Sequence, residues 1–93
     1  MVTTSNVSLS STPSQILAAN QSRISWVIRN NDTTNDCKIG GPSVLFSNGI
    51  TIPKGQAFGA DHDSQHNESA YEIWGVCDTG KTAAIEVLSV TGD

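Results

Sequence analysis

Short segments in which apolar and polar residues alternate, each followed by a turn-forming cluster, constrain this fold most strongly. In the clearest of them, Ile24, Trp26 and Ile28 alternate with the residues between them, so we expect these three to share an inward face. Residues 82–90 form another, with alternate apolar residues expected to face inward. We also expect a short strand at residues 44–46, followed by a turn at 47–49 in which Gly49 supplies a positive φ. Gly-, Asn- and Pro-rich turn signals recur about every 8–12 residues, and the helical crossovers that a parallel sheet needs are missing. We therefore predict an all-β fold, a small antiparallel β-sandwich or barrel of about seven to nine short strands.

The chain has 93 residues, a length that suits one domain. We expect residues 13–93 to form a single β-sandwich domain, preceded by residues 1–12 as an N-terminal arm or as its first strand. Ser, Thr and Asn dominate residues 1–12, and the backbone of such an arm can pair with the sheet edge of a neighbouring subunit. The alternative is an ordinary first strand with frayed terminal residues.

The charge balance argues against two classes of partner. Five Lys and Arg against nine Asp and Glu give a net charge of −4, and only 15 % of residues are charged. A nucleic-acid-binding protein needs a basic face, and electrostatic attachment to anionic lipid needs a basic cluster. No apolar run approaches the 18 residues of a transmembrane helix. We therefore predict no nucleic-acid partner and no membrane partner, and we expect a protein partner.

Potential metal ligands gather in residues 61–68, which hold both histidines of the chain. His62 and His66 are four residues apart, a spacing that places two imidazoles on one face of a helix. The segment has no helical pattern, and no Cys or further His completes a ligand set. We interpret it as a solvated polar loop, so that no metal is expected; the lesser alternative is a metal site formed by Asp61, His62 and His66.

Motifs for catalysis are missing from the sequence. It contains no recognisable Ser, His and Asp arrangement, no Gly-rich phosphate loop and no paired-carboxylate motif. We predict a protein that is not an enzyme and that needs no cofactor.

Two cysteines, Cys37 and Cys77, are expected on inward faces of different strands. A disulfide between them would close a loop of about 40 residues and would stabilise the fold by about 4 kcal/mol on the chain-entropy model. The sequence shows no secretion signal, and thiols in the cytosol stay reduced. We therefore favour buried free thiols over a bridge.

Some apolar residues alternate away from the expected core and are candidates for a binding interface. Trp74, Val76 and Leu88 are of this kind, and Val7 and Leu9 join them if residues 1–12 act as an arm. An exposed apolar patch is normally covered by a neighbour, so we predict a homo-oligomer, with a trimer ahead of a dimer. The alternative for Trp74 is a central strand that is covered on both faces.

A series of short motifs follows in a specific order along the chain. The segment 14–23 contains the letters ILAAN followed by Arg23, and residues 26–31 end in Asn30 and Asn31. The later motifs are IG at 39–40, NGI at 48–50, YEI at 71–73 and IEVL at 85–88. Over residues 5–90 this pattern resembles a recurrent module of tailed bacteriophages. The 61–69 loop and the two cysteines depart from that module.

The resemblance implies a small virion structural protein, notably a head decoration (cement) protein, and it implies no catalytic residues. We therefore expect a protein made in the bacterial host cytoplasm that binds the outer surface of the assembled capsid and stabilises the head. Its partner would be the major capsid protein. The alternative is a tail, fibre or receptor-binding component, with carbohydrate contacts through Trp74 or Tyr71.

Overall fold

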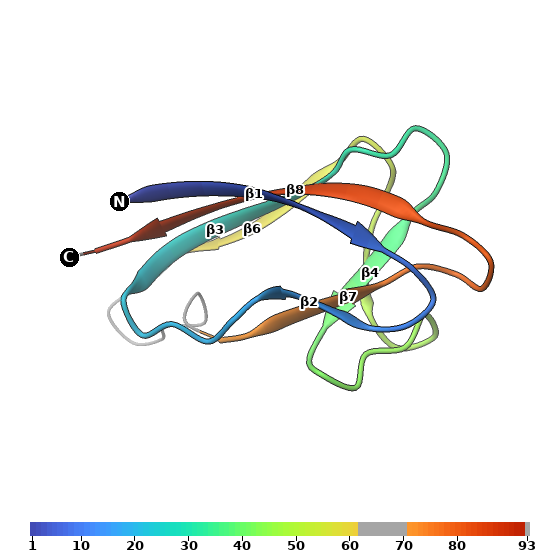
Figure 1. Ribbon diagram of the computed structural model, residues 1–93, viewed down its shortest axis with the longest axis horizontal. Helices are drawn as coiled ribbons and strands as arrows, with labels where there is room; N and C mark the ends of the chain where they lie inside the picture. Colours follow the sequence, from blue (N-terminus) through green and yellow to red (C-terminus); the bar gives the residue numbers. More distant parts are fainter. Residues whose placement is uncertain (62–70, 93) are drawn as a thin grey trace.

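The computed structural model describes residues 1–61 and 71–92, and strands are the regular elements of this part of the chain (Figure 1). The prediction of an all-β fold is confirmed, and of the two architectures the structure is a sandwich. The strands are β1 (Val2–Leu9), β2 (Ser14–Leu17), β3 (Arg23–Asn30), β4 (Cys37–Gly40), β5 (Ile50–Ile52), β6 (Ala57–Asp61), β7 (Ile73–Val76) and β8 (Ala83–Thr91).

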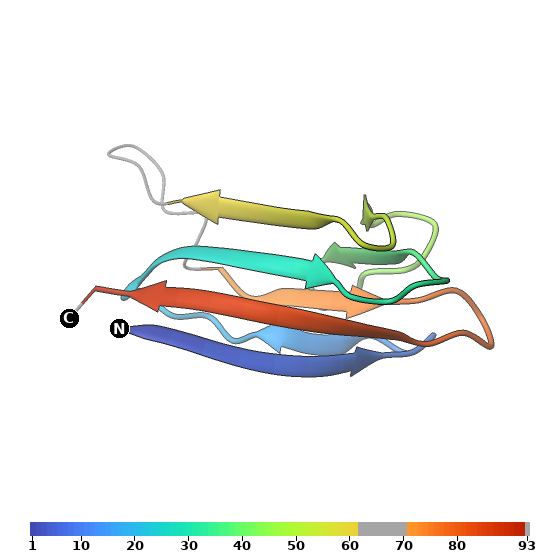
Figure 2. The same cartoon turned by 90° about the horizontal axis from the view of Figure 1, so that it is seen from above.

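Two four-stranded antiparallel sheets pack face to face (Figures 1 and 2). The long sheet has the order β1-β8-β3-β6, and the short sheet has the order β2-β7-β4-β5. Of the connections between consecutive strands, only β4 to β5 stays within one sheet. The two layers are therefore held together by the chain itself as well as by the core between them.

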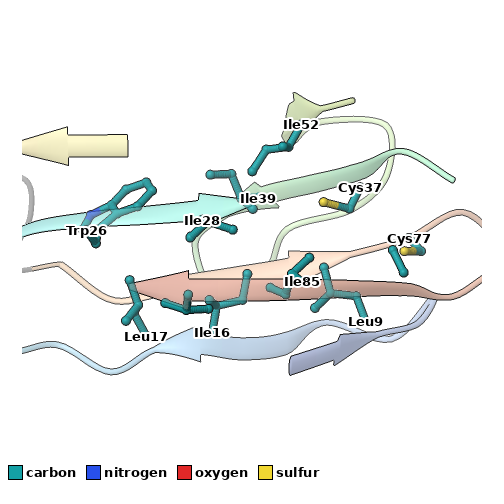
Figure 3. Close-up of a cluster of buried hydrophobic side chains, with 12 residues drawn as sticks. Leu9, Ile16, Leu17, Trp26, Ile28, Cys37, Ile39, Ile52, Cys77 and Ile85 are labelled. Atoms are coloured by element: carbon teal, nitrogen blue, oxygen red, sulfur yellow. The ribbon is translucent and has the colours of Figure 1, made fainter. Parts of the chain in front are cut away.

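The core consists of inward-facing side chains from both sheets (Figure 3). Alternation along each strand explains the pattern, because successive side chains point to opposite faces of a sheet. The cluster contains Leu9, Ile16, Leu17, Trp26, Ile28, Cys37, Ile39, Ile52, Cys77, Ala83, Ile85 and Val87.

The N-terminal segment is an ordinary first strand and not an arm. β1 pairs with β8 over its whole length, from Val2 opposite Val90 to Leu9 opposite Ala83. The terminal amine of Met1 donates a hydrogen bond to the Thr91 carbonyl at 2.6 Å. The start of β1 and the end of β8 therefore lie together at one end of the long sheet (Figure 2).

A β-bulge near the start of β3 changes which of its residues point toward the core, compared with the prediction. Trp26 and Ile28 are buried as predicted, but Ile24 is 43 % exposed. The register between β3 and β8 shifts between Arg23 and Ser25, so the alternation changes phase at that point. Arg23 consequently points inward in place of Ile24.

The segment at Val44–Phe46 also differs from expectation, because it forms turns where we predicted a strand. Val44 N–H donates to the Gly41 carbonyl at 3.0 Å, and Asn48 N–H donates to the Leu45 carbonyl at 3.0 Å. Gly49 was expected to supply a positive φ, but within the described residues only Gly55 and Gly80 have one. Gly49 is required for close packing, as described below.

Candidate binding surface

Two of the five residues predicted to form a binding interface are buried within the chain. Leu9 is 0 % exposed and Val76 is 2 % exposed, so both predictions are wrong. Leu9 faces the interior from the end of β1, and a Cβ added to Gly75 of the opposite sheet would lie 2.9 Å from its Cδ1. Val7 is half-buried on the same side and packs against the core. The apolar residues in the second half of β1 therefore serve the core of their own chain.

Val76 is buried in a different way, on the outer face of the short sheet. It lies opposite Lys38 in the β4–β7 pair, and directly paired residues point to the same face. The 41–49 loop folds over this face, since a Cβ added to Gly49 would lie 2.7 Å from Lys38 Cβ and 2.9 Å from Val44 Cγ2. Alternation indicated correctly that Val76 points away from the main core. It could not reveal the loop that covers this face.

Trp74 lies on the same outer face of the short sheet, paired with Gln15 of β2 and Gly40 of β4. It is half-buried, and its Nε1 donates a hydrogen bond to Glu72 Oε1 at 2.6 Å. The indole has no other hydrogen-bond donor, so its polar group is already satisfied within the chain. The neighbouring Tyr71 is exposed.

Leu88 is the predicted interface residue that lies on an open sheet face. It is 37 % exposed on the outer face of the long sheet, in one row with Thr4 of β1 and Val27 of β3. Val27 is 43 % exposed and was not among the predicted interface residues. The signal was present, because Val27 lies between the buried Trp26 and Ile28 and must point the other way.

A shallow groove of about 420 Å³ runs over this face of the long sheet. Val27 and Leu88 form an apolar pair along one side of it. In the adjacent row, Arg29 Nη1 lies 3.9 Å from Glu86 Oε1, an exposed ion pair that contributes at most about 1 kcal/mol to stability. Exposed apolar residues next to polar ones are typical of a protein interface. The lining residues are Thr4, Ser5, Asn6, Val27, Arg29, Glu86, Val87 and Leu88.

A glycine leaves Val27 uncovered on its other side. Gly59 of β6 pairs directly with Val27. A Cβ added to Gly59 would lie 2.8 Å from the Trp26 carbonyl oxygen, a backbone atom that cannot rotate away. Any side chain at this position would push β6 away from β3. The position next to Val27 on β6 therefore has no side chain.

Two buried polar residues hold the loops at the ends of β3. Asn30 Nδ2 donates to the carbonyls of Asn35 and Ile52, both at 3.0 Å, and its Oδ1 accepts from Asp32 N–H at 3.0 Å. At the other end, Arg23 Nη2 donates to the Ala18 carbonyl at 2.6 Å. These contacts keep β3, which carries Val27, fixed at both ends.

The cysteines do not form a reactive site. Both are buried, as predicted, and both are free thiols in the structure. Burial, with a smaller contribution from the adjacent Cys77, raises the pKa of Cys37 to about 12. Burial also raises the pKa of Cys77. Both thiols therefore stay protonated near neutral pH, where only the thiolate is a good nucleophile or metal ligand.

The alternative metal site falls mainly outside the described residues, because His62 and His66 belong to the segment 62–70. Asp61 ends β6. Within residues 1–61 and 71–92, no three His, Cys, Asp or Glu residues come together as a potential metal site. In the same part of the chain no helix is long and apolar enough to span a membrane.

No known family model matches the chain, and neither does any curated protein or solved structure.

Proposed function

We propose that the protein is a non-enzymatic structural component of a tailed-bacteriophage virion. It binds the outer surface of the assembled capsid as a decoration (cement) protein, and the major capsid protein is its partner. The observation that carries this proposal is the open outer face of the long sheet, where the exposed apolar row of Val27 and Leu88 lies beside the polar row of Arg29 and Glu86. The motif order along the chain supplies the reason for choosing a virion.

The outer face of the long sheet suits a protein partner more than a nucleic acid. It exposes the apolar Val27 and Leu88, and its charged residues Arg29 and Glu86 neutralise each other. The whole chain carries a net charge of −4, which opposes binding to the packaged genome. Apolar contact with the shell from outside is the interaction that this surface favours.

Binding of this kind would stabilise the head by linkage. A ligand that prefers the assembled shell to the separated subunits shifts the equilibrium toward assembly by the free energy of its own binding. A shell offers many identical sites, and an oligomeric ligand gains further from avidity. A homo-oligomer with modest affinity per copy is therefore sufficient.

The test compares virions made with and without the gene for this chain. We expect the protein in hundreds of copies per particle by quantitative mass spectrometry, and we expect particles without it to release their DNA at a lower temperature. A handful of copies would contradict the proposal and would favour the tail, fibre or receptor-binding alternative. Equal release temperatures would rule out a cementing role.

A further inference from the structure

The free edge of β1 presents a row of unpaired backbone groups. Met1 and Thr91 exchange hydrogen bonds in both directions, so they form a hydrogen-bonded pair of the β1–β8 ladder. Such pairs alternate along an antiparallel ladder, so residues 3, 5, 7 and 9 also direct their N–H and C=O groups toward β8. The residues between them direct theirs away from β8, toward the free edge. These residues are Val2, Thr4, Asn6 and Ser8.

β1 has none of the features that normally protect a sheet edge. Edge strands are protected by shortness, by Pro, by charged side chains or by bulges. β1 is eight residues long, its register with β8 has no shift, and residues 1–22 contain no Asp, Glu, Lys or Arg.

The other three edge strands each have such protection. β2 is four residues long, follows Pro13 and has a register shift. β5 has three residues and is followed by Pro53. β6 has five residues, three fewer than β1, and Gly59 lies in its interior. Among the four edges, β1 alone is long, regular and uncharged.

We propose that β1 pairs with β1 of a second copy of this chain, antiparallel and about a two-fold axis at Ser5. This register opposes Val2 with Ser8 of the partner subunit, and Thr4 with Asn6 of the partner subunit. It is the register that uses all four outward-directed residues, because a shift of the axis to Thr4 or Asn6 leaves one of them unpaired. The two long sheets become one continuous eight-stranded sheet.

A second copy is the occupant that the sequence of β1 favours. Two copies of a strand that carries charges of one sign repel each other, and β1 carries no charged side chain. In this arrangement Ser5 faces the partner's Ser5, and cross-strand pairs of Ser and Thr are favourable. A two-fold contact of one strand with itself is closed, so it produces a dimer and leaves no free β1 edge for further growth.

The proposed dimer is tested with the purified full-length chain and without capsids, so its failure and the failure of the proposed function are distinguishable. Analytical ultracentrifugation from about 10 μM to 1 mM should show a concentration-dependent dimer of twice the 9.8 kDa chain mass. Thr4→Pro removes an outward N–H and leaves the ladder to β8 intact, so it should abolish the dimer and keep the fold. Thr4→Val retains the N–H and is the matched control.

Cross-linking tests the register. In the proposed dimer, two Cys residues from Ser5→Cys face each other in a non-hydrogen-bonded pair, with Cα atoms about 4.5 Å apart, within disulfide range. In Ser8→Cys the two thiols lie six residues apart along the strands, about 20 Å. With glutathione disulfide as oxidant, Ser5→Cys should cross-link at least tenfold faster than Ser8→Cys. The wild-type chain, with its two buried thiols, serves as the blank.

Several outcomes would overturn the proposal. A monomer at 1 mM excludes it, and so does a trimer. A dimer that persists in Thr4→Pro must use another surface. Equal cross-linking rates for Ser5→Cys and Ser8→Cys would exclude the two-fold axis at Ser5.

Discussion

At the residue scale, two buried polar residues hold the ends of β3. Arg23 and Asn30 each donate to a backbone carbonyl of an adjacent loop, that of Ala18 and that of Asn35. A buried polar group must find hydrogen-bond partners, so these residues determine how the chain enters and leaves β3. Both residues serve the fold, and the candidate binding face is formed by other residues.

Replacing Asn30 should show how much this position contributes to stability. Asn30→Ala leaves the Ile52 carbonyl, the Asn35 carbonyl and the Asp32 N–H without their partner, at about 1–3 kcal/mol for each buried group. We expect a loss of about 2–4 kcal/mol, since part of this loop is reached by water. Urea unfolding measures the change through the midpoint at constant slope.

A matched control for Asn30 is available on the surface. Asn48 Oδ1 also accepts a backbone hydrogen bond, from Leu45 N–H at 2.8 Å, but this contact is exposed. Asn48→Ala should therefore cost less than about 1 kcal/mol. If both variants unfold at the same urea concentration, burial of the Asn30 amide is not what makes it important.

At the scale of the elements, the alternation of apolar residues predicted the inward faces of most strands. It failed where the backbone departs from regular alternation or where a loop covers a sheet face. The alternation of Trp26 with Ile28 and of Ile85 with Val87 identified inward faces correctly. The bulge after Arg23 depends on pairing with β8, which is remote in sequence. The cover over Val76 depends on the path of the 41–49 loop. Both are long-range features that a local pattern does not contain.

The pairing of β6 with β3 should depend on the missing side chain of Gly59. Gly59→Ala places a methyl group 2.8 Å from the Trp26 carbonyl oxygen, so β6 must move away from β3. We expect a loss of about 1–3 kcal/mol, as for other overpacked sites. For a domain of this size that lowers Tm by several degrees, at about 4–8 °C per kcal/mol.

The control for Gly59 is Gly41, where an added Cβ would meet nothing within 4 Å. Gly41 does not have a positive φ, so Gly41→Ala should leave Tm unchanged or raise it slightly. Hydrogen exchange should also become faster in β6 of Gly59→Ala and stay unchanged in Gly41→Ala. Equal Tm values for the two variants would show that β6 is not held closely against β3.

At the scale of the whole molecule, the two sheets differ in what they offer a partner. The outer face of the short sheet is partly covered by its own 41–49 loop, whereas that of the long sheet carries the open groove. Pairing of two β1 edges would place both grooves on one continuous sheet. Leu88 was predicted as an interface residue, whereas the equally open Val27 was not. The groove is lined by residues that lie side by side on neighbouring strands. Only the register of the strands shows which residues are neighbours.

From the groove we predict that the protein binds the capsid through apolar contact and that this binding persists at high salt. Val27→Thr keeps the shape and the strand propensity of this exposed residue but replaces one methyl group by a hydroxyl, so the fold should be unchanged. Loss of part of the apolar burial, about 1 kcal/mol, should weaken binding per copy about fivefold. Arg29→Gln, which removes an exposed ion pair, should change binding by less than twofold. Co-sedimentation with stripped capsids measures both affinities.

Ionic strength separates the two physical mechanisms for this contact. The screening length falls from about 10 Å at 0.1 M salt to about 3 Å at 1 M, which weakens a contact between exposed charges. An apolar contact does not weaken in this way, so wild-type binding should persist at 1 M salt while Val27→Thr stays weaker at both concentrations. Two results would show that charge, and not apolar contact with Val27 and Leu88, determines recognition. These are loss of binding at 1 M salt, or weaker binding by Arg29→Gln than by Val27→Thr.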